Sequence, residues 1–155
     1  MNFTHANASL PLANDPALWV SLYLGKPWVS GACGPDAFDC WGLLWAVYRE
    51  QFGIEIARYP GVAEAGTLET VRRIEGWKDL PEWETLAAPV HGCAVAMSMN
   101  LRFHHVGMFL DVDGGLVIHA ADGRNVVAES LPRLRQTGIK RQAFFIPRHG
   151  QHTFL

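Results

Sequence analysis

The fold is decided by one stretch of the sequence, in which a turn-forming run leads directly into a helix that begins at a cysteine: Gly34-Pro35-Asp36-Ala37-Phe38-Asp39-Cys40-Trp41-Gly42-Leu43-Leu44-Trp45. After the turn, apolar residues recur at helical spacing, at Cys40, Leu43, Leu44, Val47, Tyr48 and Phe52. This spacing predicts a helix from about Cys40 to Phe52 that ends at Gly53. A thiol in its first turn faces unpaired backbone N–H groups and the positive end of the helix dipole, which favour the thiolate. Cys40 is therefore a candidate nucleophile.

A cysteine on an apolar helix face is more often a small buried hydrophobic residue than a nucleophile, so the catalytic interpretation needs a base. The chain has three cysteines, Cys33, Cys40 and Cys93, and its N-terminus lacks the basic start and apolar run of a signal peptide. An odd number of cysteines without such a signal argues against a disulfide framework. We expect free thiols in a protein made in the cytoplasm.

Length and composition predict a single globular domain over residues 1–155, with about 1–14 and 148–155 as terminal extensions. No window approaches the roughly 18 apolar residues that cross a bilayer, so no stable membrane insertion is expected. The net charge is uneven: residues 1–123 hold seven Lys/Arg and fourteen Asp/Glu, whereas 124–155 hold six and one. Dispersed basic residues are more often a solvated face than a binding surface, and no nucleic-acid motif accompanies them, so no nucleic-acid partner is predicted.

Helices are predicted to precede strands. Asp15 and Pro16 are the cap and first-turn proline of a short helix that ends at Gly25, and a third helix is predicted from Thr67 to Trp77. An irregular connection follows as far as Val90. The predicted strands are 93–99, 105–111, 116–119, 125–129 and 139–146. This order indicates an α+β fold in which helices pack on one side of an antiparallel β-sheet meander.

A base for Cys40 is sought among His91, His104, His105 and His119, although each of these alone is more often a structural residue. His105 begins one predicted strand and His119 ends the next, so the register of this hairpin decides whether they meet. A two-residue loop would place them on opposite faces. A three-residue loop, 112–114, instead places His119 diagonal to His105 on one face, roughly 7 Å away. His104 would face away from His105, and we favour His105 as the base.

Four segments give the sequence a resemblance to the NlpC family of papain-like cysteine peptidases, and most closely to its phage tail branch. They are Gly25-Lys26-Pro27-Trp28, Phe38-Asp39-Cys40-Trp41-Gly42-Leu43, His105-Val106-Gly107-Met108-Phe109-Leu110 and Val117-Ile118-His119-Ala120. They occur in the family's order and with similar spacing. The resemblance implies the papain-like NlpC fold, a nucleophilic Cys40, a base His105, and His119 as the residue that orients this base.

The resemblance also implies a substrate and a setting. Family members mostly hydrolyse amide bonds in the peptide stems of bacterial cell wall without a cofactor, and Asp39, Trp41 and Trp28 stand at positions that shape the substrate site. Many relatives have serine in place of Trp41 and tyrosine in place of Trp28. The phage branch, in which a tryptophan after the cysteine is familiar, implies a tail-tip component of the virion that acts in the periplasm and cell wall. Its partners would be other tail-tip proteins, such as hub or assembly proteins.

Two alternatives stay open. The chain could be a structural tail-tip subunit that keeps the fold for docking and has weak chemistry. It could also be a zinc or redox protein, with Cys40, His105 and His119 as zinc ligands or with Cys33 and Cys40 as a thiol pair, although no CxxC or HExxH spacing is present.

Overall fold

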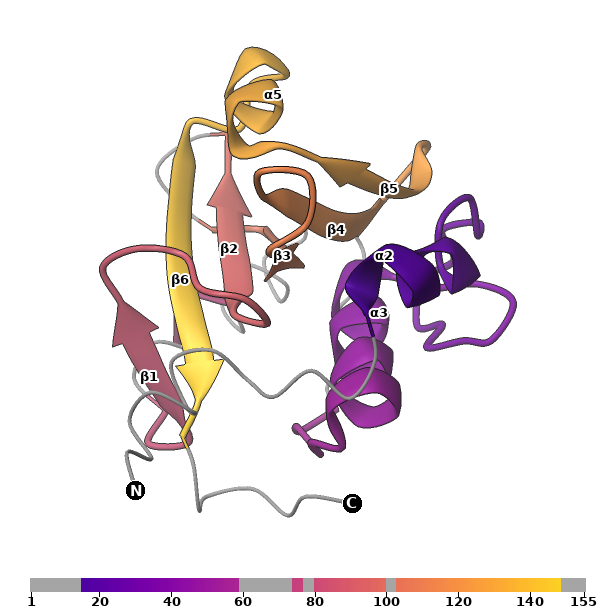
Figure 1. Cartoon of the computed structure of the whole chain (residues 1–155), viewed down its shortest axis with the longest axis horizontal. Coiled ribbons are helices and arrows are strands. Elements are labelled where there is room, and N and C mark those ends of the chain that lie inside the picture. The colour runs from indigo at the N-terminus through magenta and orange to yellow at the C-terminus, as the bar shows by residue number, and fades with distance from the viewer. Residues whose placement is uncertain (1–14, 59–73, 77–79, 100–102, 149–155) are drawn as a thin grey trace.

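The structure is a computed structural model that describes residues 15–58, 74–76, 80–99 and 103–148. Within these residues, short helices on the N-terminal side are followed by a six-stranded antiparallel sheet (Figure 1). The α+β class predicted from the order of the elements is confirmed. The predicted helix Thr67–Trp77 lies outside the described residues except for 74–76, which are helical.

The helices follow the predicted caps and stops. Helix α2 (Pro16–Trp19) is capped by the Asp15 side chain and continues as a 3₁₀ turn (Val20–Leu22), so it is shorter than predicted. Helix α3 (Cys40–Val47) begins at the predicted cysteine. It continues as a π-helical turn (Tyr48–Phe52), and Gly53 ends it with a φ of 67°. The range 40–52 is therefore confirmed, with a looser second half.

The sheet has the strand order β1-β6-β2-β3-β4-β5. Its strands are β1 (Trp83–Leu86), β2 (Ala94–Ser98), β3 (His105–Leu110), β4 (Leu116–Ala121), β5 (Asn125–Glu129) and β6 (Arg141–Pro147). All five predicted strands are present. The meander covers only β2 to β5, because β6 returns across the sheet to pair with β2.

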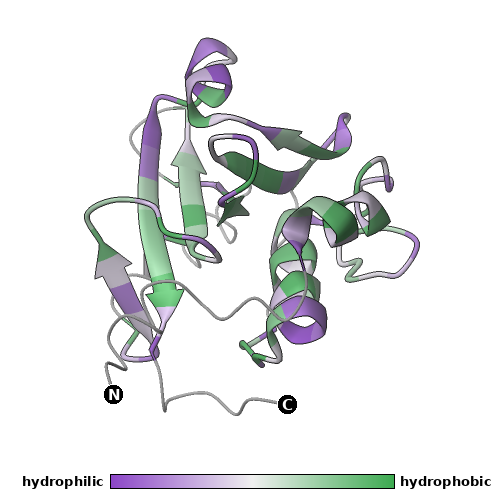
Figure 2. Cartoon of the chain, in the orientation of Figure 1, coloured by the Kyte–Doolittle hydropathy of each residue, from purple (hydrophilic) through white to green (hydrophobic). Residues whose placement is uncertain are grey.

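Two elements correct the prediction. The connection before Val90 was predicted to be irregular, yet it contains β1, which pairs with β6 at the far end of the sequence. No helix was predicted between the strands 125–129 and 139–146, yet this stretch forms helix α5 (Leu131–Gln136), capped by Ser130. Hydrophilic residues gather on α5 and at the adjoining start of β6 (Figure 2). The local sequence did not predict β1, because the strand that it pairs with, β6, is more than fifty residues further along the chain.

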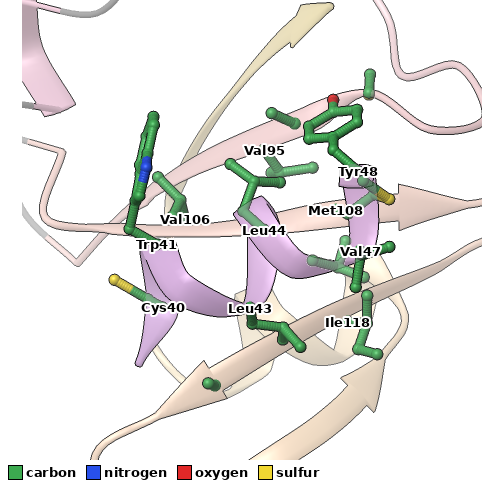
Figure 3. Close-up of a cluster of buried hydrophobic side chains, with 14 of the residues drawn as sticks. Cys40, Trp41, Leu43, Leu44, Val47, Tyr48, Val95, Val106, Met108 and Ile118 are labelled. Atoms are coloured by element: carbon green, nitrogen blue, oxygen red, sulfur yellow. The ribbon is translucent and has the colours of Figure 1, made fainter. Parts of the chain in front are cut away.

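The core lies between α3 and the sheet. Seven of the eight residues of α3 are buried, as expected for a helix that is apolar all round. Figure 3 shows the helix against the central strands, where its apolar side chains form one buried cluster with Val95, Val106, Met108 and Ile118. This packing fixes the start of α3 beside β3. Among the described residues, no helix is long and apolar enough to cross a membrane.

Candidate active site

The start of α3 is held by the Asp39 carboxylate. Its Oδ1 accepts a hydrogen bond from the Gly42 N–H at 2.6 Å, and its Oδ2 accepts one from the Gly31 N–H at 2.7 Å. The Asp39 N–H itself donates to the Ala32 carbonyl at 2.9 Å. A Cβ on Gly42 would lie 2.0 Å from this same carbonyl oxygen, so only glycine fits there. Residues 31–42 therefore form a closed turn around the beginning of the helix.

Cys40 is the first residue of α3 and is only 4% exposed (Figure 3). Burial, and after it the Asp39 carboxylate, raises the pKa of the Cys40 thiol to about 12. Hydrogen bonds from backbone N–H groups, including that of Val106, offset only part of this rise. The sequence predicted that the helix start favours the thiolate and that a histidine base completes its formation. In this conformation the thiol is protonated, because burial outweighs the helix terminus.

His105 and His119 meet on one face of the sheet. Met108 pairs with Ile118 and Leu110 pairs with Leu116, which confirms the register predicted from a three-residue loop. His105 Nε2 and His119 Nδ1 are 2.8 Å apart, and the ring centroids are 4.9 Å apart. A Cβ on Gly107 would lie 2.9 Å from the Cβ of His119, so this glycine permits the close approach.

Both imidazoles are neutral near neutral pH. Burial, with the nearby imidazoles of His119 and His104, holds the pKa of His105 well below its usual value. Burial also lowers the pKa of His119 to about 4, although the Glu129 carboxylate opposes this shift. In a bond between two neutral imidazoles, one ring donates and the other accepts. The bond uses Nε2 of His105 and leaves its Nδ1 for another partner.

A cleft of about 240 Å³ lies beside the two imidazoles. The residues that line it include His104, His105, His119, Asp122 and Arg124. Cys40 does not line it, and none of the described contacts joins its thiol to either imidazole. The thiol instead lies against the backbone of Val106, the residue after His105.

The residues predicted to shape the substrate site are largely engaged within the protein. Trp41 is 4% exposed, and its indole N–H donates to the Ala57 carbonyl at 2.8 Å. Trp28 is partly buried, packs against the core, and bridges Phe38 through its backbone. Both oxygens of Asp39 bind backbone N–H groups. Contacts of these three residues with a substrate stay predictions.

Sequence reasoning missed Glu129. This residue is 7% exposed at the end of β5, and its carboxylate forms an ion pair with Arg124. Its other oxygen lies 4.0 Å from His119 Nε2. The register of the next hairpin is the signal that places Glu129 here, because His119 lies opposite Val127 and Glu129 is two residues further along the same face.

Among the described residues, no group of three His, Cys, Asp or Glu side chains is arranged to hold a metal ion. The zinc alternative, which would use Cys40, His105 and His119, therefore finds no site there. The three cysteines are free thiols.

A helix that begins at a cysteine and packs on an antiparallel sheet with paired histidines defines the papain-like class of fold. Within this class the chain belongs to the NlpC/P60 family, whose model matches residues 25–143. The structure is similar to the crystal structure of the NlpC/p60 domain of the peptidoglycan hydrolase SagA, with 20% sequence identity and a TM-score of 0.54. This match covers 87% of the present chain and 100% of that chain. A comparison with curated protein sequences finds no match.

Proposed function

We propose that this protein is a cysteine peptidase that hydrolyses amide bonds in the peptide stems of bacterial cell wall. Cys40 is the nucleophile, His105 the base, and His119 the residue that orients the base. The observation that carries the proposal is the 2.8 Å contact between the two imidazoles, next to the strand backbone that contacts the Cys40 thiol. Membership of the NlpC/P60 family, and the fold shared with a peptidoglycan hydrolase, support it.

The proposed reaction is acyl transfer through a thioester. Because the pKa of the buried Cys40 thiol is about 12, the thiol does not ionise alone at neutral pH, and its proton passes to Nδ1 of His105 as sulfur attacks the amide carbonyl. Backbone N–H groups near Cys40 stabilise the oxyanion that forms. His105 then protonates the leaving amine, and water hydrolyses the thioester.

The proposed setting is a phage tail tip. There the protein would be made in the host cytoplasm and carried by the virion to the cell wall, where it would act during DNA entry or tail assembly beside other tail-tip proteins. This part of the proposal rests on the resemblance of residues 38–43, with Trp41 directly after the cysteine, to the phage branch.

A second candidate is a structural tail-tip subunit with weak chemistry. The observation that favours it is the burial of the Cys40 thiol away from the cleft. Two apolar side chains are also exposed on the N-terminal helices: Leu18 in α2 is 73% exposed, and Leu22 in the following 3₁₀ turn is 62% exposed. Such side chains would suit docking to another protein.

The two candidates are separated by incubating the protein, and its Cys40→Ala variant, with cell-wall stem peptides and following new amino groups by mass spectrometry. Cleavage by the parent protein and none by Cys40→Ala is the expected result. Cys33→Ala is the matched control, because Cys33 is a free thiol outside α3 and its loss should leave cleavage unchanged. Cleavage by neither parent nor variant, with Cys40 alkylated no faster than an ordinary thiol, would favour the structural subunit.

A further inference from the structure

Three neighbouring strands carry polar side chains on one face of the sheet, in a row that leads away from Cys40. His105 on β3 is diagonal to His119 on β4, across Gly107. Glu129 on β5 is diagonal to His119 in the same way, across Val127. Oε1 of Glu129 forms an ion pair with Arg124, and Oε2 faces His119.

The facing atoms of His119 and Glu129 are both buried, and neither has a hydrogen-bond partner among the described residues. They are 4.0 Å apart, which is too long for a hydrogen bond. The low pKa of His119 means that its ring is neutral, so the contact is not an ion pair. A carboxylate oxygen can only accept a hydrogen bond, and a buried acceptor next to an imidazole nitrogen favours the tautomer in which that nitrogen carries the proton.

The tautomer of His119 in turn determines the tautomer of His105. If the proton of His119 is on Nε2, its Nδ1 has a lone pair and accepts a hydrogen bond from Nε2–H of His105. His105 then has no proton on Nδ1, and this nitrogen can act as a base. If the proton of His119 were on Nδ1, the same 2.8 Å contact would run in the other direction and His105 would carry its proton on Nδ1. The proton on Nδ1 of His105 would then prevent this nitrogen from acting as a base, although the distance between the two rings would be unchanged.

We propose that Glu129 is a positioning residue that holds the proton of His119 on Nε2, so that His105 presents an unprotonated Nδ1 to Cys40. The inference rests on the proposed function only for the role of His105 as a base. The tautomers of the two histidines can be measured without any substrate.

Arg124 makes the Glu129→Gln variant a sharp test. The guanidinium has only donors, so it retains the amide oxygen of the glutamine and turns the NH₂ group toward His119. Nε2 of His119 must then accept, and the proton moves to Nδ1. In serine proteases, the same carboxylate-to-amide change at the residue that orients the histidine selects the wrong tautomer and lowers kcat about 10⁴-fold.

The experiment is a two-dimensional ¹H–¹⁵N spectrum of the imidazole nitrogens near pH 7, recorded on the full chain and on the variant. We expect protons on Nε2 of both His105 and His119 in the parent protein, and on Nδ1 of both in Glu129→Gln. With stem peptide as substrate, kcat of the variant should fall about 100-fold or more, with KM nearly unchanged.

Two controls separate this role from a structural one. Arg124→Gln breaks the same ion pair but keeps the carboxylate, so its tautomers should be those of the parent protein. Glu84→Gln changes an exposed carboxylate on β1 and should alter neither tautomers nor kcat.

A proton on Nδ1 of His119 in the parent protein would overturn the inference, even if Glu129→Gln fails to fold. Unchanged tautomers in a folded Glu129→Gln protein would do the same. If the expected tautomers are found and the parent protein cleaves no stem peptide, the proposed function fails while the role of Glu129 in setting the tautomer stands.

Discussion

The two halves of the candidate site are held in different ways. The cysteine half, residues 31–42, is a closed turn in which the Asp39 carboxylate is satisfied by backbone N–H groups, and Cys40 is almost fully buried. The histidine half is spread over β3, β4 and β5, borders a cleft, and includes buried polar atoms of His119 and Glu129 without hydrogen-bond partners among the described residues. The proposed nucleophile is therefore held by local backbone contacts, whereas the proton positions proposed for the histidines depend on side chains that are distant in the sequence.

The largest expected effect is a loss of stability when the turn in the cysteine half is disrupted. A methyl group at Gly42 would lie 2.0 Å from the Ala32 carbonyl oxygen, and backbone on both sides would have to move. We expect Gly42→Ala to lower the free energy of unfolding by about 3 kcal/mol, measured by urea denaturation. Gly76→Ala is the matched control, because a Cβ there meets nothing within 4 Å. Equal stability of the two variants would contradict the packing described for the start of α3.

The next expected effect is a pH-dependent change in stability that arises in the histidine half. Because burial lowers the pKa of His119 to about 4, the unfolded chain binds a proton below about pH 6.5 that the folded protein does not bind until about pH 4. Stability should therefore fall as pH drops from 6.5 to 4, by about 3 kcal/mol from this residue.

The contribution of His119 is measured by urea denaturation of the parent protein and of His119→Asn at several pH values. The variant should lose part of the slope between pH 6.5 and 4, since asparagine does not titrate. Identical slopes would show that the His119 pKa is not depressed in the folded protein.

A smaller loss of stability is expected when Asp39 is replaced by asparagine. Asn has one acceptor oxygen where Asp39 uses two, so Asp39→Asn leaves one backbone N–H without its partner and should cost about 1 kcal/mol of stability. The same change removes a negative charge that raises the pKa of Cys40, so this pKa should fall. The rate of Cys40 alkylation by iodoacetamide at pH 8 should rise. A slower rate would contradict the electrostatic role given to Asp39.

The sequence was most informative where local chemistry decides the structure. Asp39 and Gly53 bound the helix, and the loop 112–114 set the register that brings His105 to His119. The remaining features depend on contacts that no local pattern contains. β1 exists because β6 pairs with it, the protonated state of Cys40 follows from burial, and Glu129 gains its place from the register of a second hairpin.

We propose above all that Cys40, His105 and His119 form one catalytic unit. Its most direct test is an electrophilic stem peptide, such as a chloromethyl ketone, with the labelled residue identified by mass spectrometry. We expect labelling at Cys40 and not at the free thiols of Cys33 or Cys93, and a rate that falls about 100-fold in His105→Ala. Labelling of Cys40 at the same rate in His105→Ala, or no labelling of Cys40 in the parent protein, would contradict it.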